Sequence, residues 1–253
     1  MNRETVKAQL QALHMKTAAK ELDETLENCK GRLSFDWLSQ LLEREVDARK
    51  ERALQWRIKR AQFPRVTTLE QFDWDFNPDI NRDKVMELAT LEFIERRKIA
   101  LFLGKPGTGK THLALALALK AAEQGKKVFC TSLKKLSGQI IEAKQRGKLD
   151  RLFRRILSAN LWLLDDWGVV SMSQEVAEEV FDLLDRRLGQ NALLVTSNRD
   201  VDEWPSLFHE PVIASAAIDR LFDDSTIVTF VGDSYRLAGK VESHTATMKL
   251  HND

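Results

Sequence analysis

Apolar and polar positions follow two alternating patterns along the chain from residue 99 onward. Short apolar runs alternate with stretches in which apolar residues recur at helical spacing. The apolar runs predict strands at 99–103, 127–131, 161–164 and 193–197. The helical spacing predicts helices at 110–124, 133–146, 148–158 and 173–188. Strands that alternate with helices form a parallel sheet covered on both faces, so the expected fold class is α/β.

The first part of the chain is helical in pattern throughout. Residues 1–63 contain no proline and a single glycine, Gly31. We expect two helices, at about 6–26 and 34–61, separated at Gly31 and ended by Pro64. A unit of this size buries little apolar surface by itself, so we expect it to dock on a neighbour.

An irregular segment at 64–84 follows, with an aromatic cluster and two prolines, and then a helix is expected at about 82–96. The last dozen residues lack periodicity. The chain is therefore expected to comprise a small all-helical N-terminal domain at 1–63, an α/β domain at 64–240 and a flexible tail at 241–253.

A complete G-x-x-x-x-G-K-[ST] motif stands between the first predicted strand and the helix after it. Its residues are Gly104, Lys105, Pro106, Gly107, Thr108, Gly109, Lys110 and Thr111. Such glycines let backbone N–H groups surround phosphate oxygens, and the following helix points its N-terminal dipole at the anion. An ordinary glycine-rich turn is the alternative, but it does not require all four fixed positions in this context. The motif predicts that the chain binds a nucleoside triphosphate.

The side chains of this motif have distinct expected roles. Lys110 would reach the β- and γ-phosphates, and the hydroxyl of Thr111 would ligate Mg²⁺. His112, which opens the predicted helix, is included among the expected nucleotide contacts. ATP and Mg²⁺ are therefore the expected cofactors.

Two adjacent acids follow the third predicted strand, at the end of a parallel strand where ligands bind in an open α/β sheet. Asp165 is expected to hold Mg²⁺ through its water shell, and Asp166 to polarise the attacking water. The alternative is that one or both acids cap the turn at Gly168. Asn198, after the next strand, is expected to reach the γ-phosphate or the water, although such residues also serve in turns. Arg220 is ambiguous by itself, because most arginines pair with surface carboxylates.

Composition limits the class of protein further. Hydrophobic residues make up 43% of the 253 residues, which is enough for a packed core. No apolar stretch is long enough to span a bilayer, and the N-terminus lacks the apolar segment of a secretory signal. Two cysteines, Cys29 and Cys130, are too few for a disulfide framework. We expect a cytoplasmic protein with no membrane partner.

The net charge of +1 hides two local basic runs. Residues 44–65 hold eight basic and three acidic residues, a balance of +5, and a second run covers 144–155. Charge runs are often only solvated helix faces, but two on one nucleotide-binding chain favour contact with DNA phosphates. The candidate DNA-binding residues are Arg49, Lys50, Arg52, Arg57, Lys59, Arg60, Lys144, Arg146 and Arg151.

The chain resembles the AAA+ ATPases of the DnaC/IstB group in three motifs: the phosphate loop at 104–111, the stretch Leu-Leu-Asp-Asp-Trp-Gly at 163–168, and Thr-Ser-Asn at 196–198. The segments 33–38, 43–60 and 72–78 are similar to the IstB branch in particular. The similarity extends to about residue 240.

This resemblance implies an ATPase that helps insertion-sequence transposition. It implies a homo-oligomer assembled with ATP on duplex DNA, selection of the target site, and recruitment of a cognate transposase. By the same resemblance Asn198 takes a sensor role, and Arg220 matches an arginine finger that reaches the γ-phosphate on a neighbouring subunit. Arg236 is a further candidate phosphate sensor. Asp166 stands where many AAA+ proteins have Glu, and its shorter side chain would suit slow hydrolysis.

Two other functions are compatible with a phosphate loop. A replicative helicase loader of the DnaC type has the same ATPase core and would use its N-terminal helices on a helicase. A metabolic phosphotransferase would need an acceptor pocket, and the sequence has no second glycine-rich loop or cluster of lid arginines to suggest one.

Overall fold

A computed structural model describes the backbone of residues 3–28 and 36–238. The chain divides into two compact units, Met1–Trp56 and Arg57–Asp253, and each is considered by itself. The expected tail at 241–253 and the expected helix start at Ser34 lie outside the described residues. Within those that are described, no helix has both the length and the apolar character needed to cross a bilayer.

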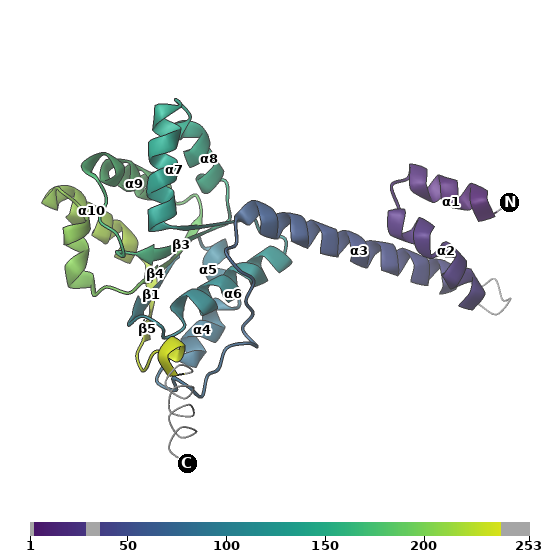
Figure 1. Ribbon diagram of the computed structural model, residues 1–253, viewed down its shortest axis with the longest axis horizontal. Helices are drawn as coiled ribbons and strands as arrows, with labels where there is room; N and C mark the ends of the chain where they lie inside the picture. The colour runs from purple at the N-terminus through teal and green to yellow at the C-terminus, as the bar shows by residue number, and fades with distance from the viewer. Residues whose placement is uncertain (1–2, 29–35, 239–253) are drawn as a thin grey trace, which may run out of the picture. The chain divides into compact units, whose positions relative to one another are not determined.

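The second unit is built on a sheet of five parallel strands (Figure 1). The strands are β1 (Ile99–Gly104), β2 (Val128–Ser132), β3 (Leu161–Trp167), β4 (Ala192–Ser197) and β5 (Ser225–Phe230). Their order across the sheet is β2-β3-β4-β1-β5. Because β1 lies between β4 and β5, the loop after β1 opens beside the end of β4. The predicted α/β class is confirmed.

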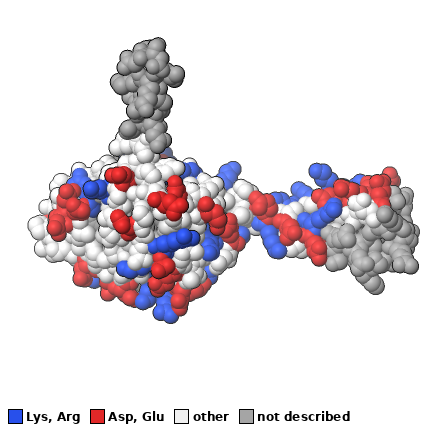
Figure 2. All heavy atoms as spheres, turned by 90° about the horizontal axis from the view of Figure 1, so that it is seen from below, with Lys and Arg blue, Asp and Glu red and all other residues white. Residues whose placement is uncertain are grey.

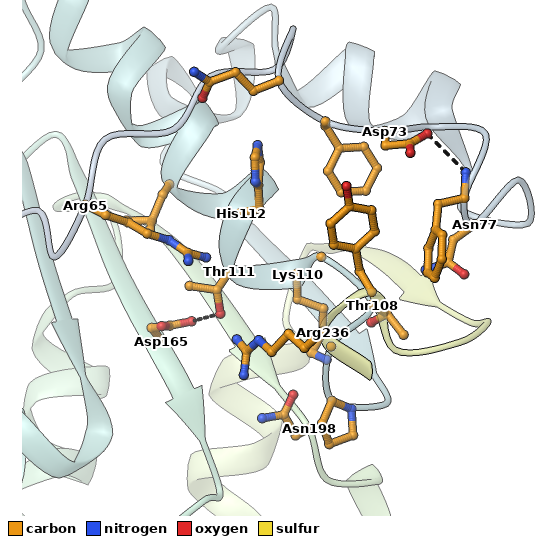
Figure 3. Close-up of a pocket in the computed structure, with 18 of the residues that line it drawn as sticks. Arg65, Asp73, Asn77, Thr108, Lys110, Thr111, His112, Asp165, Asn198 and Arg236 are labelled. Carbon is orange, nitrogen blue, oxygen red and sulfur yellow. Dashed lines mark hydrogen bonds between the residues drawn. The ribbon is translucent and has the colours of Figure 1, made fainter. Parts of the chain in front are cut away.

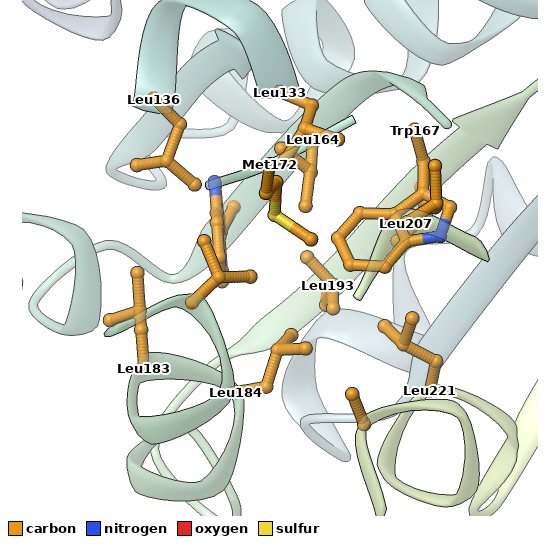
Figure 4. Packing of buried hydrophobic residues seen from close by; sticks show 14 of the residues in the cluster. Leu133, Leu136, Leu164, Trp167, Met172, Leu183, Leu184, Leu193, Leu207 and Leu221 are labelled. Atoms are coloured by element: carbon orange, nitrogen blue, oxygen red, sulfur yellow. The ribbon is translucent and has the colours of Figure 1, made fainter. Parts of the chain in front are cut away.

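Helices cover both faces of the sheet (Figure 1). On one face lie α4 (Arg82–Leu88), α5 (Glu92–Glu95) and α6 (Lys110–Glu123). On the other lie α7 (Leu133–Gln145), α8 (Leu149–Leu157), α9 (Gln174–Arg186) and α10 (Pro211–Phe222), and the 3₁₀ helix η1 (Val201–Leu207) precedes α10. The largest apolar cluster fills the space between this second layer and the sheet, where Trp167 and Leu193 pack against Leu183, Leu207 and their neighbours (Figure 4).

The N-terminal unit is helical, as predicted, but its helices divide differently. The expected single first helix is two, α1 (Arg3–Ala12) and α2 (Lys16–Asn28), because His14 adopts a left-handed φ of 57°. The second expected helix is α3 (Asp36–Ala61). Ala18, Leu22 and Leu41 form the buried apolar contact between α2 and α3.

Helix α3 runs past the division between the units. Arg57, the first residue of the second unit, donates from Nε to the carbonyl oxygen of Ala122 on α6 at 2.7 Å. The last turn of α3 is therefore attached to the second unit. The predicted domain boundary after residue 63 stays a prediction.

The expected helix at 82–96 is wrong as a single element. It is interrupted between α4 and α5, where Leu91 takes a left-handed φ of 66° and the hydroxyl of Thr90 bonds the carbonyl of Glu87. Helix α10 and strand β5 were not predicted. The strand that was expected to stop at Leu164 continues to Trp167 through an irregularity in its pairing with β4.

Candidate active site

The phosphate loop takes a conformation that requires its glycines. Gly107 has φ 84° and Gly109 has φ 101°, both in the left-handed region. A Cβ at Gly107 would collide with the hydroxyl of Ser234, and one at Gly109 would collide with the ring of Phe72. Two distant segments thus pack directly on the loop. Helix α6 begins immediately after it, so its N-terminal dipole faces the cavity.

Lys110 lies buried beneath this loop, with 4% of its surface exposed. Its Nζ donates to the carbonyl oxygen of Lys105 at 2.6 Å. Burial lowers the pKa of Lys110 to about 8, although the nearby carboxylates of Asp166 and Asp165 act in the opposite direction. Because burial disfavours the charged form of Lys110, an anion that binds beside it stabilises that charged form.

Thr111 and Asp165 face each other across the sheet edge. The Thr111 hydroxyl donates to Oδ1 of Asp165 at 2.8 Å, and the Thr196 hydroxyl donates to the same oxygen at 2.5 Å. One hydroxyl and one carboxylate, both oxygen donors, are thereby held together at the end of the phosphate loop. This donor set fits Mg²⁺, which binds proteins through few carboxylate and hydroxyl ligands and keeps several waters.

Asp166 has a strained backbone that the sequence did not reveal. Its φ is 57°, a left-handed conformation that Asp adopts more readily than most residues, and its N–H donates to the Thr196 hydroxyl at 3.0 Å. Burial and the neighbouring Asp165 raise the pKa of Asp166, while Arg236 and Lys110 oppose that shift. Asn198 donates from Nδ2 to Oδ1 of Asp166 at 3.5 Å. The arrangement turns a carboxylate of increased basicity toward the cavity.

Lys110, Thr111, Asp165, Asp166 and Asn198 line one cavity of about 570 Å³ (Figure 3). It brings together nearly all the residues predicted for nucleotide and metal: Pro106, Gly107, Thr108, Gly109, Lys110, Thr111, His112, Asp165, Asp166, Asn198 and Arg236. Arg236 extends among Lys110, Asp165 and Asn198 in Figure 3. Gly104 and Lys105 form the base of the loop, and Lys105 accepts hydrogen bonds from Lys110 and Thr108.

The segment 64–77 supplies cavity residues that the sequence analysis did not assign to the site. It contributes Pro64, Arg65, Gln71, Phe72, Asp73, Phe76 and Asn77. Thr67 donates to the carbonyl of His112 at 3.1 Å, and the His112 ring bonds the carbonyl of Thr68 at 3.0 Å. His112 therefore anchors this segment to α6. The aromatic cluster noted in the sequence was the available signal, but only the fold shows what it covers.

Arg220 is not among the residues that line the cavity. It lies on α10, where it donates to Asp185 at 3.1 Å and to Asp219 at 3.3 Å, with 35% of its side chain exposed. The same chain's phosphate loop is therefore not its partner in this structure. A role as a finger would require the cavity of another subunit.

Four basic residues of the first run are paired with acids within the N-terminal unit: Arg44, Arg49, Lys50 and Arg52. Arg49 and Arg52 both bond Oε1 of the buried Glu45, at 2.7 and 3.2 Å. Lys50 pairs with Asp47 at 3.4 Å on the exposed surface.

Beyond the N-terminal unit the candidate DNA residues are mixed in environment. Lys59, Arg60 and Arg151 are exposed. Lys144 bonds Glu175 and Glu179 at 2.9 Å each, and Arg146 bonds Glu142 at 2.9 Å. Figure 2 shows basic and acidic side chains intermixed on the visible face of each unit rather than gathered into one large basic field.

The sheet order β2-β3-β4-β1-β5, with a phosphate loop after β1 and an acid pair on β3, defines a P-loop ATPase of the AAA+ class. The family of IstB-like ATP binding proteins matches residues 5–243. The chain belongs to that family.

Curated relatives agree with this assignment over most of their length. The chain is 39% identical over 212 residues to a protein of Pseudomonas aeruginosa named as an ATP-binding protein of insertion sequence IS21, covering 84% of this chain and 80% of that protein. It is 29% identical over 230 residues to the corresponding protein of insertion sequence IS232 from Bacillus thuringiensis subsp. berliner, covering 90% and 92%.

Solved structures share the fold of the ATPase unit. The crystal structure of DnaI has a TM-score of 0.56 at 21% identity, covering 65% of this chain and 91% of that one. The AMPPCP-bound DnaA of Aquifex aeolicus has a TM-score of 0.54 at 23% identity, covering 66% and 50%. These likenesses show the fold alone.

Proposed function

We propose that this ATPase assembles on duplex DNA in its ATP-bound state and recruits a cognate transposase to the chosen target. The observation that carries the proposal is the cavity of Figure 3, in a chain whose relatives are named as ATP-binding proteins of insertion sequences. The cavity supports a conformational state that depends on nucleotide, and the names of the relatives support a role in insertion-sequence transposition.

Hydrolysis is assigned to five side chains of the cavity. Lys110 neutralises the terminal phosphates, and Asp166 accepts a proton from the attacking water, which its raised pKa favours. Asn198 orients that carboxylate or the water through its amide. Thr111 and Asp165 hold Mg²⁺, which would offset negative charge on the phosphates. Asp166 is shorter than the usual Glu, so we expect slow turnover.

Assembly follows from two features of the chain. Arg220 lies outside its own cavity, which suits a finger offered to a neighbouring subunit. In addition, the modest excess of positive charge at 44–65 would bind DNA weakly in one copy. An oligomer repeats that surface along the duplex, and linked contacts raise the effective affinity.

The proposal is tested by gel shift on unrelated duplexes, with and without Mg·ATP, for the wild-type protein and Lys110→Ala. We expect cooperative, salt-sensitive binding by the wild type with Mg·ATP only, and none by the variant. Equal binding by both proteins would separate DNA contact from the nucleotide and overturn the proposal.

A second titration locates the DNA surface. Lys59→Ala with Arg60→Ala should weaken binding on all duplexes alike and flatten the salt dependence, because phosphate contacts carry no sequence information. Arg57 is kept, since it bonds the Ala122 carbonyl and its loss would disturb α3. Arg96→Ala with Lys98→Ala removes the same charge outside both basic runs and serves as the control. Equal effects of the two pairs would remove Lys59 and Arg60 from the interface.

The helicase loader reading has less support. The structure titled as the DnaC helicase loader matches at 19% identity, whereas the relatives with higher identity are named as proteins of insertion sequences. Co-purification with a transposase encoded beside this chain, against a replicative helicase, would decide between the two.

A further inference from the structure

Arg236 reaches the cavity from the segment that follows β5. In the described part of this segment, residues 235–238 are helical, with hydrogen bonds from the N–H groups of Leu237 and Ala238 to the carbonyl of Ser234 at 2.9 and 3.1 Å. The contacts of this segment with the rest of the unit fix where the Arg236 side chain lies.

Asn77, in the segment 64–77, binds the backbone of the segment that carries Arg236. Its Nδ2 donates to the carbonyl oxygen of Asp233 at 3.2 Å, and its Oδ1 accepts from the N–H of Asp233 at 3.1 Å. The side chain thus pairs with both backbone groups of one residue, and only 4% of Asn77 is exposed. This pair of hydrogen bonds suits a side-chain amide, because an amide has one donor and one acceptor side by side.

Two neighbouring features pack around the contact between Asn77 and Asp233. Gly232 has φ 109°, and a Cβ there would collide with Oδ1 of Asn77. Phe76 and Tyr235 meet edge to face with ring centroids 4.9 Å apart. The N–H of Tyr235 donates to the carbonyl of Gly107 at 3.1 Å, which ties the turn to the phosphate loop as well. The segment that carries Arg236 therefore contacts both segment 64–77 and the phosphate loop.

We propose that Asn77 is a positioning residue that holds Arg236 over the phosphate site by pairing with the backbone of Asp233. Arg236 lies close enough to Lys110 and Asp166 for its charge to act on both groups. Asn77 itself lines the cavity, so the segment 64–77 would both contact a nucleotide in the cavity and fix the position of Arg236 beside it. This inference deepens the proposed function, because it rests on Arg236 contacting those phosphates.

The test is a double-mutant cycle on Mg·AMPPCP affinity and on KM and kcat for ATP. Arg236→Ala should weaken nucleotide binding about tenfold, the loss expected for one charge-assisted contact. Asn77→Ala should produce most of that loss. In the Arg236→Ala background Asn77→Ala should add almost nothing, because the group it positions is already gone.

Two further variants exclude a merely structural effect. Asn81→Ala is the matched control, since Asn81 also bonds a backbone N–H, that of Lys84, but lies outside the cavity. It should lower thermal stability and leave nucleotide affinity unchanged. Asn77→Asp keeps the acceptor for the Asp233 N–H but sets a carboxylate oxygen against the Asp233 carbonyl, so it should weaken nucleotide affinity at least as much as Asn77→Ala, and it serves where the alanine variant does not fold.

The outcomes separate the two levels of the hypothesis. If Arg236→Ala leaves affinity and turnover unchanged, Arg236 is no phosphate contact and the nucleotide assignment itself is wrong at this residue. If Arg236→Ala has its effect but Asn77→Ala has none, or adds fully to it, Asn77 does not position Arg236.

Discussion

The nucleotide cavity and the part of helix α3 that belongs to the N-terminal unit both contain basic residues, but the charge has a different environment in each. In the cavity, Lys110 donates to a carbonyl, and no carboxylate among the described residues lies within ion-pair distance of its Nζ. On α3, Arg49 and Arg52 share the carboxylate of Glu45, and Lys50 faces Asp47. One region keeps a buried cation for a ligand, and the other neutralises its cations within the chain.

This difference teaches that a count of basic residues does not measure readiness to bind anions. A phosphate that approaches Lys110 meets a cation whose charge is already unfavourable because of burial, so its binding relieves a cost. A phosphate that approaches Arg49 must compete with a carboxylate 2.7 Å away. DNA affinity from α3 should therefore depend on repetition in an assembly more than on any single residue.

Arg220 is the strongest test of the difference between the cavity and α3. It pairs with carboxylates as the α3 cations do, yet it is assigned a role in the cavity of a neighbouring subunit. We expect Arg220→Ala to bind Mg·ATP normally and to lose assembly-stimulated hydrolysis by about 10³-fold, as for a finger supplied in trans. Arg186→Ala, a nearby arginine that also pairs with surface acids, should hydrolyse ATP as the wild type does.

Mixed assemblies test the intersubunit position of Arg220 directly. Arg220→Ala and Asp166→Asn are defective on opposite sides of a junction, so mixing them should restore part of the activity. No recovery at any ratio, once co-assembly is confirmed, would place Arg220 among the locally paired surface residues.

The acid pair of the cavity should divide its roles. Asp166→Asn should retain Mg·ATP affinity but lower turnover about 10²-fold, because an amide cannot accept the proton. Asp165→Asn should instead raise the Mg²⁺ concentration required for binding. Paired measurements of nucleotide affinity and turnover over a Mg²⁺ series check this, and the reverse pattern would exchange the two assignments.

Lys110 should give nucleotide binding a pH dependence. Its pKa of about 8 in the free protein means that the cation is present below this pH and lost as pH rises through it. Because phosphates bind the protonated form, affinity for Mg·AMPPCP should fall by up to about tenfold for each pH unit above 8. Titration calorimetry between pH 7 and about 9.5 measures it, and a flat profile would show that Lys110 stays charged.

Glu45 should affect the N-terminal unit alone. Its carboxylate accepts from the N–H of Ala18 at 3.0 Å in addition to the two arginines, so Glu45→Ala leaves the buried N–H of Ala18 without this partner. We expect a loss of about 1–3 kcal/mol, read as faster hydrogen exchange at Ala18, with ATP turnover unchanged. Asp47→Ala, which removes an exposed pair, should cost at most about 0.5 kcal/mol.

The parts of the fold that the sequence predicts are those whose signals lie within a few residues of one another. The phosphate loop, β1 and α6 are contiguous, and their apolar pattern and glycines act within a few residues of one another. The acid pair and Asn198 follow apolar strands, so their common edge follows from the parallel sheet. The helix breaks at His14 and Leu91 occur at ordinary residues with left-handed φ, and no glycine or proline marks them.

The remainder of the site depends on contacts between distant segments. Arg65 was counted in a basic run, yet its side chain lines the nucleotide cavity. Asn77 and Asp233 are 156 residues apart, and a lone Asn in an irregular segment carries no sign of such a partner. The left-handed backbone of Asp166 follows from the irregular pairing of β3 with β4, which apolar periodicity does not record.

The most direct test compares two lysine-to-alanine changes that remove the same charge, one in the cavity and one on α3. We expect Lys110→Ala to lose Mg·AMPPCP binding by at least about 10²-fold in titration calorimetry, with its circular dichroism unchanged. Lys50→Ala, whose side chain is 74% exposed and faces Asp47, should bind the nucleotide as tightly as the wild type. Equal affinities for the two variants would contradict the assignment of the cavity and the distinction between the two regions.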